Sequence, residues 1–241
     1  MCGRFTLTSS DERRLGSRFQ ISLDDQMENA LARYNVAPTQ EVLTVQNDSE
    51  GGGHHAQLAR WGLVPFWAKD LKVGYKMINA RAEGLMKSRA YAPLVKKSSS
   101  RCLILADGFY EWMKAENPKE AKQPFHFTVD GGEPFAFAGL ATTREWEGEQ
   151  MTSCTIITTT PNEEVEPVHN RMPVILPDEE AEAAWLSEKL EPEEAISLCK
   201  PLESGRITAK PANKSMSKVG GVKEGPHMLD PDAEAPEPAE A

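Results

Sequence analysis

The sequence predicts a single β-rich domain with a few helices. Its apolar residues fall in short strand-like runs, of which 101–105 and 152–160 are the clearest, and the expected helices are few, one after residue 8 and two within 177–199. No internal repeat and no second domain divides the 241 residues, a length that one β-rich domain can reach. We therefore expect a folded domain over residues 1–222 and a disordered acidic tail over 223–241.

In the first half of the chain, a strand-like run at 5–8 is followed by a helix. Serine and threonine caps with early acidic residues predict that this helix begins within 8–12 and turns Leu15 and Phe19 inward. The turn-forming stretch 34–40 then leads into a strand that we expect at Glu41 to Gln46. The polar, glycine-rich stretch that follows, Asn47 to His55, predicts a hairpin tip.

In the second half, an Asp-Gly-Gly turn at 130–132 is expected to join strands over 124–129 and 134–141. An apolar strand is expected over 172–176. The acidic segment after it predicts two helices, over 177–187 and about 192–199. Their expected inner face comprises Trp185, Leu186, Ile196 and Leu198.

The net charge of −10 is unevenly distributed. Residues 178–203 carry −7 and residues 223–241 carry −5, which leaves +2 on the rest of the chain. Because local potential decides whether a polyanion can dock, the mildly basic body permits DNA binding. There is no apolar run of about 18 residues and no apolar leader, so we expect a cytoplasmic protein that does not bind membranes.

The four cysteines have no spacing typical of a metal site or a disulfide framework. We expect no metal and no cofactor, with Cys102 and Cys154 in the core. Cys2 differs, because removal of Met1 would place an α-amine and a thiol on adjacent carbons. Their ordinary pKa values, about 7.7–8.0 and about 8.5, leave both groups partly reactive at neutral pH. The alternative is an exposed cysteine without function in a frayed terminus.

Three further stretches carry polar groups among apolar neighbours. Asn79 begins a stretch that also holds a guanidinium and a carboxylate, although a helix N-cap would explain the asparagine equally well. Glu111 is flanked by aromatic residues, and partial desolvation in a strand would raise its pKa into a useful acid–base range; an exposed strand glutamate is the alternative. His169 and Arg171 precede the apolar strand at 172–176. Of the tryptophans, we expect Trp61 in the core.

Taken together and in order, seven stretches resemble the SRAP family, named for SOS response-associated peptidase. They are MCGRF at 1–5, YNVAPTQ at 34–40, RWGLVP at 60–65, NARAE at 79–83, RCL at 101–103, GFYEW at 108–112 and HNRMP at 169–173. The glycines at 51–53, Gly84 and the acidic tail depart from the family pattern. The resemblance extends to about residue 205 and implies a single α+β domain with a β-rich, barrel-like, mostly antiparallel core flanked by helices.

The resemblance further implies covalent crosslinking to abasic sites in single-stranded DNA during the DNA damage response, with peptidase-like removal of residues ahead of Cys2 and a lyase-like activity. By analogy with the family, Asn79 would orient the Cys2 amine or the sugar, and Glu111 would act as general acid–base group. His169, with an ordinary pKa of about 6.5, would protonate the sugar ring oxygen.

The same resemblance assigns the expected DNA contacts. Three arginines would hold phosphates, two tryptophans would stack on or wedge against bases, and a proline would line the groove; these residues are Arg4, Arg81, Arg171, Trp112, Trp67 and Pro38. We expect a monomer whose partner is single-stranded DNA containing abasic sites. The acidic tail would contribute only repulsion, so its deletion should leave crosslinking intact or slightly faster.

Two other functions stay open. A cysteine peptidase or amidohydrolase would use Cys2 as nucleophile with His169 as base, without a free amine. A non-covalent DNA-binding module would tolerate Cys2→Ala, which neither covalent mechanism would.

Overall fold

The computed structural model describes residues 2–47, 53–114, 121–217 and 224–233. The strands are β1 Arg4–Leu7, β2 Arg33–Val36, β3 Glu41–Asn47, β4 His54–Trp61, β5 Asn79–Arg81, β6 Arg101–Ala106, β7 Gly108–Met113, β8 Gln123–Val129, β9 Phe135–Trp146, β10 Glu149–Thr159, β11 Met172–Pro173 and β12 Ile207–Pro211. The α-helices are α1 Glu12–Phe19, α2 Ala92–Val95, α3 Glu179–Leu186 and α4 Pro192–Leu198. Short 3-10 helices connect them: η1 Met27–Ala30, η2 Leu71–Lys76, η3 Ala82–Lys87, η4 Ser98–Ser100, η5 Lys214–Ser217 and η6 Pro226–Leu229.

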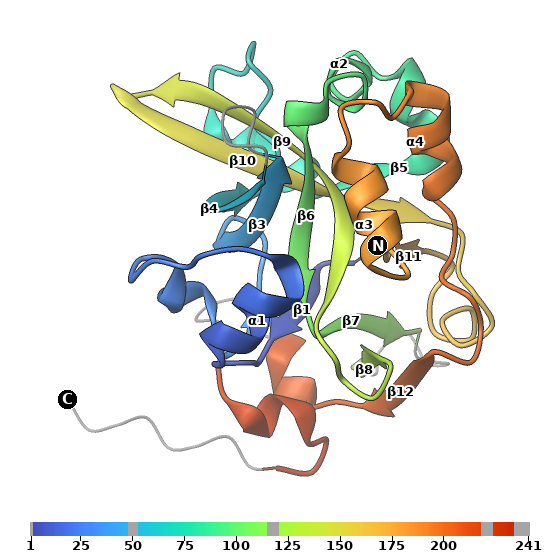
Figure 1. The fold of residues 1–241 in the computed structure, drawn as a ribbon. Coiled ribbons are helices and arrows are strands. Elements are labelled where there is room, and N and C mark those ends of the chain that lie inside the picture. Colours follow the sequence, from blue (N-terminus) through green and yellow to red (C-terminus); the bar gives the residue numbers. More distant parts are fainter. Residues whose placement is uncertain (1, 48–52, 115–120, 218–223, 234–241) are drawn as a thin grey trace.

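Five strands close into a barrel in the described part of the chain. Their order is β10-β4-β3-β6-β9, and β9 pairs with β10 to complete the ring. All these pairs are antiparallel except β10 with β4. β5 and β11 add to β10 at one end, and the β9–β10 hairpin projects from the barrel at the other (Figure 1). The α+β class with a barrel-like, mostly antiparallel core is confirmed.

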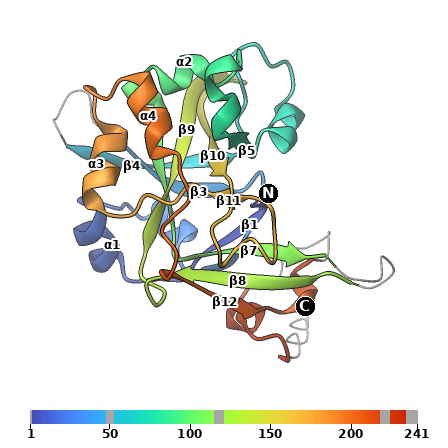
Figure 2. The same cartoon turned by 90° about the vertical axis from the view of Figure 1, so that its right-hand side faces the viewer.

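A second antiparallel sheet, in the order β12-β8-β7-β1-β2, lies beside the barrel (Figure 2). The two share an aromatic core. The Phe5 ring of β1 lies 5.1 Å from the Trp61 ring of β4 and 5.7 Å from the Phe137 ring of β9, each edge to face. Trp61 is fully buried, as expected, and its indole nitrogen donates to the carbonyl oxygen of Ile78 at 2.9 Å.

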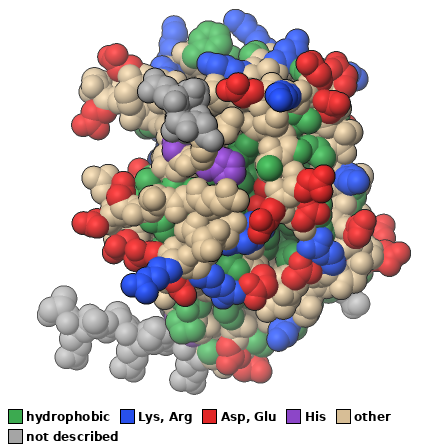
Figure 3. All heavy atoms as spheres, in the orientation of Figure 1, with side chains coloured by type: hydrophobic (Ala, Val, Ile, Leu, Met, Phe, Trp, Pro, Cys, Tyr) green, Lys and Arg blue, Asp and Glu red, His purple; other side chains and the backbone are tan. Residues whose placement is uncertain are grey.

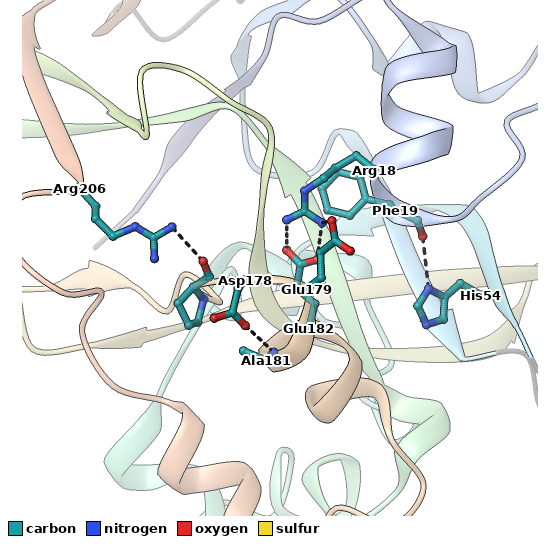
Figure 4. Close-up of polar contacts among 9 residues, drawn as sticks. Arg18, Phe19, His54, Asp178, Glu179, Ala181, Glu182 and Arg206 are labelled. Carbon is teal, nitrogen blue, oxygen red and sulfur yellow. Dashed lines mark hydrogen bonds and ion pairs between the residues drawn. The ribbon is translucent and has the colours of Figure 1, made fainter.

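Helices α1 and α3 cover one side of the barrel and are joined by charge. Both oxygens of Glu182 accept from the Arg18 guanidinium at 2.8 Å (Figure 4), and Glu182 is only 4% exposed. Asp178 caps α3 by accepting from Ala181 N at 2.8 Å. Leu15 and Phe19 are buried as expected, as is Trp185. The two helices therefore bury apolar side chains and are connected by one ion pair between Arg18 and Glu182.

Several boundaries differ from expectation, among them the strand at 172–176 and the hairpin tip after β3. The expected strand at 172–176 is only Met172–Pro173, because Val174 and Leu176 make isolated backbone bonds to β10 and β9 instead of a continuous ladder. The hairpin tip expected at Asn47 to His55 partly lies outside the described residues, and β4 already begins at His54.

The C-terminal segment also differs from the expected tail. Disorder from residue 223 onward is wrong for 224–233, which pack on the domain. Met228 in η6 is fully buried in a small cluster with Tyr110 and Met216. The composition of this segment suggested disorder, but Met228 with its neighbour Leu229 supplies enough apolar surface to dock it. The remainder, 234–241, lies outside the described residues.

Candidate active site

Cys2 lies directly ahead of β1, which runs between β7 and β2. Its side chain is fully buried, and its thiol contacts the carbonyl oxygen of Arg4 at 3.6 Å. Burial raises the pKa of the Cys2 thiol far above its ordinary value, and the negative charge of Glu111 raises it further. The thiol is therefore protonated in this structure, and a base has to accept its proton before or during any reaction.

Asn79 comes to Cys2 from the barrel. It is the first residue of β5, which runs parallel to β10 with Asn79 opposite Ile156. Its side-chain nitrogen donates to the carbonyl oxygen of Cys2 at 2.7 Å. Its other polar atom, Oδ1, is buried and accepts no hydrogen bond from the described residues. The helix N-cap alternative is wrong, because Asn79 lies in a strand and fixes the backbone of Cys2.

Glu111 and His169 lie close together beside Cys2. Glu111 lies in β7 and is 1% exposed; its Oε1 is 3.8 Å from His169 Nδ1. Burial raises the pKa of Glu111 to about 7, so the alternative of an exposed strand glutamate is wrong. Burial also lowers the pKa of His169. Near neutral pH, Glu111 exists in both protonation states, which suits a group that both donates and accepts protons.

His169 is held by its own turn. Its Nδ1 lies 3.1 Å from both the backbone nitrogen and the carbonyl oxygen of Arg171. A neutral ring accepts from the Arg171 N–H, whereas a protonated ring donates to the carbonyl oxygen. Both protonation states thus have a partner at the same nitrogen, so the ring can titrate without changing its position.

Arg171 is bound to protein groups in this structure. It is 8% exposed, and its guanidinium donates to both oxygens of Glu83 at 2.7 and 3.0 Å and to the carbonyl oxygen of Thr158 at 2.7 Å. Arg81, at the end of β5, is exposed and faces no such partner in the contacts described. A phosphate contact stays a prediction for both, and Arg81 is the more accessible of the two.

Three further expected DNA contacts, Arg4, Trp112 and Pro38, lie around the start of β1. Arg4 and Trp112 line a cavity of about 410 Å³ together with Lys122 and Ser217. The Trp112 indole donates to Ser217 Oγ at 2.7 Å. Pro38 lies in the turn after β2, at the same end of the sheet, because β2 and β7 both run antiparallel to β1.

Trp67 lies in the segment between β4 and η2. It is 39% exposed, and the Arg89 guanidinium stands 5.3 Å from its ring centre. Its neighbour Phe66 is 72% exposed and contacts it edge to face. Both rings are therefore accessible to a ligand, and the role of Trp67 in DNA binding stays a prediction.

Sequence reasoning missed a buried carboxylate that anchors β1. Asp107 is 6% exposed and accepts from Thr6 Oγ1 at 2.7 Å, Thr8 Oγ1 at 2.6 Å and Ser9 N at 3.1 Å. Gly108 beside it allows the His126 ring to approach, because a Cβ there would overlap that imidazole. These contacts fix the far end of the strand that carries Cys2. The signal available was the polar pair Asp107-Gly108 between two buried runs.

Within the described ranges, no group of three or more His, Cys, Asp or Glu side chains has a geometry that would hold a metal ion. No helix in those ranges is long and apolar enough to cross a membrane.

A buried thiol, an amide that fixes its backbone and a neighbouring carboxylate–imidazole pair are groups that suit covalent chemistry at a cysteine. The family model described as SOS response associated peptidase (SRAP) matches residues 1–219. The chain therefore belongs to the SRAP family.

Named relatives support this assignment. The chain is 44% identical over 216 residues to the abasic site processing protein YoqW of Bacillus subtilis, covering 87% of this chain and 91% of the relative. It is 30% identical over 240 residues to the abasic site processing protein YedK of Escherichia coli, covering 96% and 100%. A solved protein from Bacteroides thetaiotaomicron shares the fold, with a TM-score of 0.81 at 21% identity, covering 95% and 99%.

Proposed function

We propose that this protein, once Met1 is removed, captures abasic sites in single-stranded DNA by a thiazolidine crosslink at Cys2, and that it acts on DNA in the cytoplasm. The observation that carries the proposal is the buried Cys2, whose carbonyl oxygen accepts from Asn79 and whose thiol pKa is raised by burial and by the charge of Glu111, which in turn lies 3.8 Å from His169. The names of YoqW and YedK as abasic site processing proteins support the same substrate.

The chemistry follows from an amine and a thiol on adjacent carbons. An abasic deoxyribose is in equilibrium between a closed hemiacetal and an open aldehyde. The Cys2 amine adds to the aldehyde carbon, and the oxygen leaves as water to give an imine. The thiol sulfur then adds to the imine carbon, its proton ends on the amine nitrogen, and a five-membered ring closes. Cleavage of the DNA strand by β-elimination requires the imine, and ring closure has consumed it.

Glu111 is suited to both proton transfers. Its pKa of about 7 lets it donate a proton to the departing hydroxyl and later accept one. The second step needs a base, because the buried Cys2 thiol holds its proton tightly. Glu111 therefore receives the thiol proton as sulfur adds to the imine carbon and returns it to the nitrogen.

We assign ring opening of the sugar to His169. Its Nδ1 lies 3.1 Å from the Arg171 carbonyl oxygen, which can accept its proton, and 3.8 Å from Glu111 Oε1, whose charge favours the protonated ring. The lowered pKa makes the protonated ring a stronger acid, so it transfers its proton readily to the sugar ring oxygen. The unpartnered Oδ1 of Asn79 is available to accept from the sugar or from the Cys2 amine.

The surface beside the site supports a nucleic acid partner. Residues 66–97 carry eight Lys or Arg and two Asp or Glu, a net charge of +6. Phe66, Trp67, Tyr75 and Met86, the large apolar side chains most exposed in the described part of the chain, all lie in this segment. Figure 3 shows Lys and Arg gathered along the top of the molecule, over the region of α2. Aromatic rings among cations are typical of surfaces that bind single strands.

The peptidase alternative uses the same cysteine and differs in its need for the amine. The described contacts pair His169 with Glu111 and Arg171, while the thiol contacts Arg4, which favours proton exchange through Glu111 over a Cys–His nucleophile pair. In this proposal, a peptidase activity would only remove the residue ahead of Cys2. A lyase-like activity would arise only from the imine intermediate, before the thiol has closed the thiazolidine ring.

Intact-mass analysis tests the proposal. The protein is mixed with a single-stranded oligonucleotide that carries one abasic site, with the undamaged oligonucleotide as control. We expect one heat-stable adduct whose mass is the sum of the two reactants less one water. An adduct of protein in which the amine is blocked by acetylation, or an adduct that retains Met1, would refute the mechanism.

A further inference from the structure

The chain continues beyond the part that the SRAP family model matches. That match ends at residue 219, whereas residues 224–233 are packed on the domain. Met228 and Leu229 of this segment pack with Tyr110, and Asn213 Nδ2 donates to the carbonyl oxygens of Asp230 at 2.9 Å and Ala233 at 2.8 Å. We call residues 224–233 the C-terminal extension. It lies below the β1–β7 sheet in Figure 1.

Glu224 attaches the extension to the edge strand β2. One carboxylate oxygen accepts from Arg33 Nε at 3.0 Å. The other accepts from the backbone nitrogens of Tyr34 at 2.7 Å and Asn35 at 3.1 Å. A carboxylate thus occupies the place that a further strand's carbonyl oxygen would take, and it covers an otherwise open sheet edge.

From Glu224 a chain of hydrogen bonds continues to the turn that contains Pro38. Arg33 Nη2 donates to Gln40 Oε1 at 2.7 Å, and the same oxygen accepts from Ala37 N at 2.8 Å. These two bonds connect both ends of the Pro38 turn to Arg33. Glu224 therefore fixes Arg33, which fixes the turn.

A second contact reaches Trp112. Met216 and Met228 share one buried cluster, and Trp112 packs against it. The neighbouring Ser217 accepts from the Trp112 indole at 2.7 Å. Pro38, expected to line the DNA groove, and Trp112, expected to stack on bases, are thus both held by groups that the docked C-terminal segment contacts.

We propose that the C-terminal extension preorganises the DNA-binding groove, with Glu224 as a positioning residue that acts through Arg33 on the Pro38 turn. The inference rests on the proposed function, because it takes Pro38 and Trp112 as DNA contacts. Residues held in the bound conformation lose less entropy on binding, so the extension strengthens DNA binding. This effect on DNA affinity is opposite to that of the electrostatic repulsion that the acidic residues of the extension would exert.

Because positioning strengthens DNA binding and acidic repulsion weakens it, two point substitutions that each remove one negative charge can distinguish the two effects. Glu224→Ala and Asp232→Ala each remove one negative charge from the extension, but Asp232 is exposed and the contact described for it is made by its backbone. Fluorescence anisotropy then measures the affinity of the full chain for undamaged single-stranded DNA. We expect Glu224→Ala to weaken binding roughly 3- to 10-fold, the range for loss of a partly exposed charged hydrogen bond. Asp232→Ala should leave the affinity unchanged or slightly stronger.

The rate of crosslinking separates positioning from general destabilisation. At saturating abasic DNA, Glu224→Ala should crosslink as fast as wild type, because Cys2 and Glu111 are untouched, while its half-saturating DNA concentration rises. The half-saturating DNA concentration of Glu224→Gln, which keeps one acceptor oxygen, should lie between those of wild type and Glu224→Ala. Arg33→Ala should weaken DNA binding to the same extent as Glu224→Ala. The variant that carries both substitutions should bind no more weakly than either one, because both residues act through the same chain of contacts.

Truncation provides a second comparison. Ending the chain after residue 233 removes three acidic residues, and ending it after 223 removes three more. The first truncation should not weaken DNA binding and the second should, contrary to the sequence-based expectation that the whole tail only repels.

Equal affinities for the Glu224→Ala and Asp232→Ala variants would overturn the inference. So would an unchanged half-saturating concentration combined with a slower limiting rate. If wild type binds single strands but forms no adduct with abasic DNA, the proposed crosslinking fails, and the comparison of affinities still decides the role of Glu224.

Discussion

Glu111→Gln should slow crosslinking and at the same time stabilise the protein at neutral pH. Glutamine keeps the shape of the side chain but does not exchange a proton. Loss of general acid–base catalysis should slow adduct formation by about 10²–10⁴-fold if proton transfer limits the rate. Reversal onto a second abasic oligonucleotide should slow equally, because both directions share one transition state.

The gain in stability follows from the pKa of Glu111. Burial raises it from about 4.5 to about 7, so the folded protein binds this proton more tightly than the unfolded chain does. The free energy of unfolding of the wild type therefore falls as the pH rises from about 4.5 to about 7. At about 1.4 kcal/mol per pKa unit, the variant should gain up to about 3 kcal/mol relative to wild type across that range.

Urea denaturation of both proteins between about pH 4.5 and pH 8 measures the gain, with Glu149→Gln as control. Glu149 is an exposed residue of the β9–β10 hairpin, so its substitution controls for the loss of one carboxylate outside the buried site. A Glu111→Gln variant that crosslinks at the wild-type rate would make Glu111 structural. A stability difference that does not grow with pH would refute its raised pKa.

Substitutions at three other positions test separate parts of the structure. Cys2→Ser should stop at a labile imine or oxazolidine-like adduct and Cys2→Ala at an imine that borohydride traps; a heat-stable adduct from either contradicts the thiazolidine. Arg81→Ala should reduce the salt-dependence slope of single-strand binding by roughly 0.7, measured by anisotropy across salt concentrations, and an unchanged slope would remove Arg81 from the phosphate contacts. Gly108→Ala should destabilise the fold by about 1–3 kcal/mol in thermal melts, because the new Cβ would overlap the His126 ring and lie 2.8 Å from Thr6 Oγ1. Gly84→Ala, whose Cβ would meet nothing within 4 Å, is its control, and equal melting temperatures would contradict the overlap.

Most of the strands could be predicted because their apolar runs are local signals. β3, β6 and β8 lie where those runs were found. β9 and β10 extend beyond the predicted limits, through polar residues such as Thr143 and Arg144. Those residues project from the barrel, and the ladder between the two strands, with Trp146 opposite Glu149, holds them extended without apolar burial. A hydrophobic pattern cannot show a strand of this kind.

The environment of single residues in the candidate site could be predicted, whereas the contacts between distant residues could not. Burial of Glu111 and its raised pKa follow from its aromatic neighbours in the sequence. The pairing of Arg171 with Glu83 does not, because the two residues are 88 positions apart and meet only where β5 and β11 both join β10. The composition of the C-terminal extension likewise concealed two apolar side chains whose docking site is formed by distant strands.

The geometry of the site is set by the contact between the barrel and the second sheet. β10 aligns the segments of Asn79 and Arg171, since Asn79 lies opposite Ile156 and Met172 opposite Thr159. The β1–β7 pair aligns Cys2 with Glu111. Neither half contains a complete site, so the positions of Asn79 and His169 relative to Cys2 depend on the aromatic core that Phe5 and Trp61 form between the two halves. A change in that core would alter the reactivity of Cys2 without touching any residue that takes part in the chemistry.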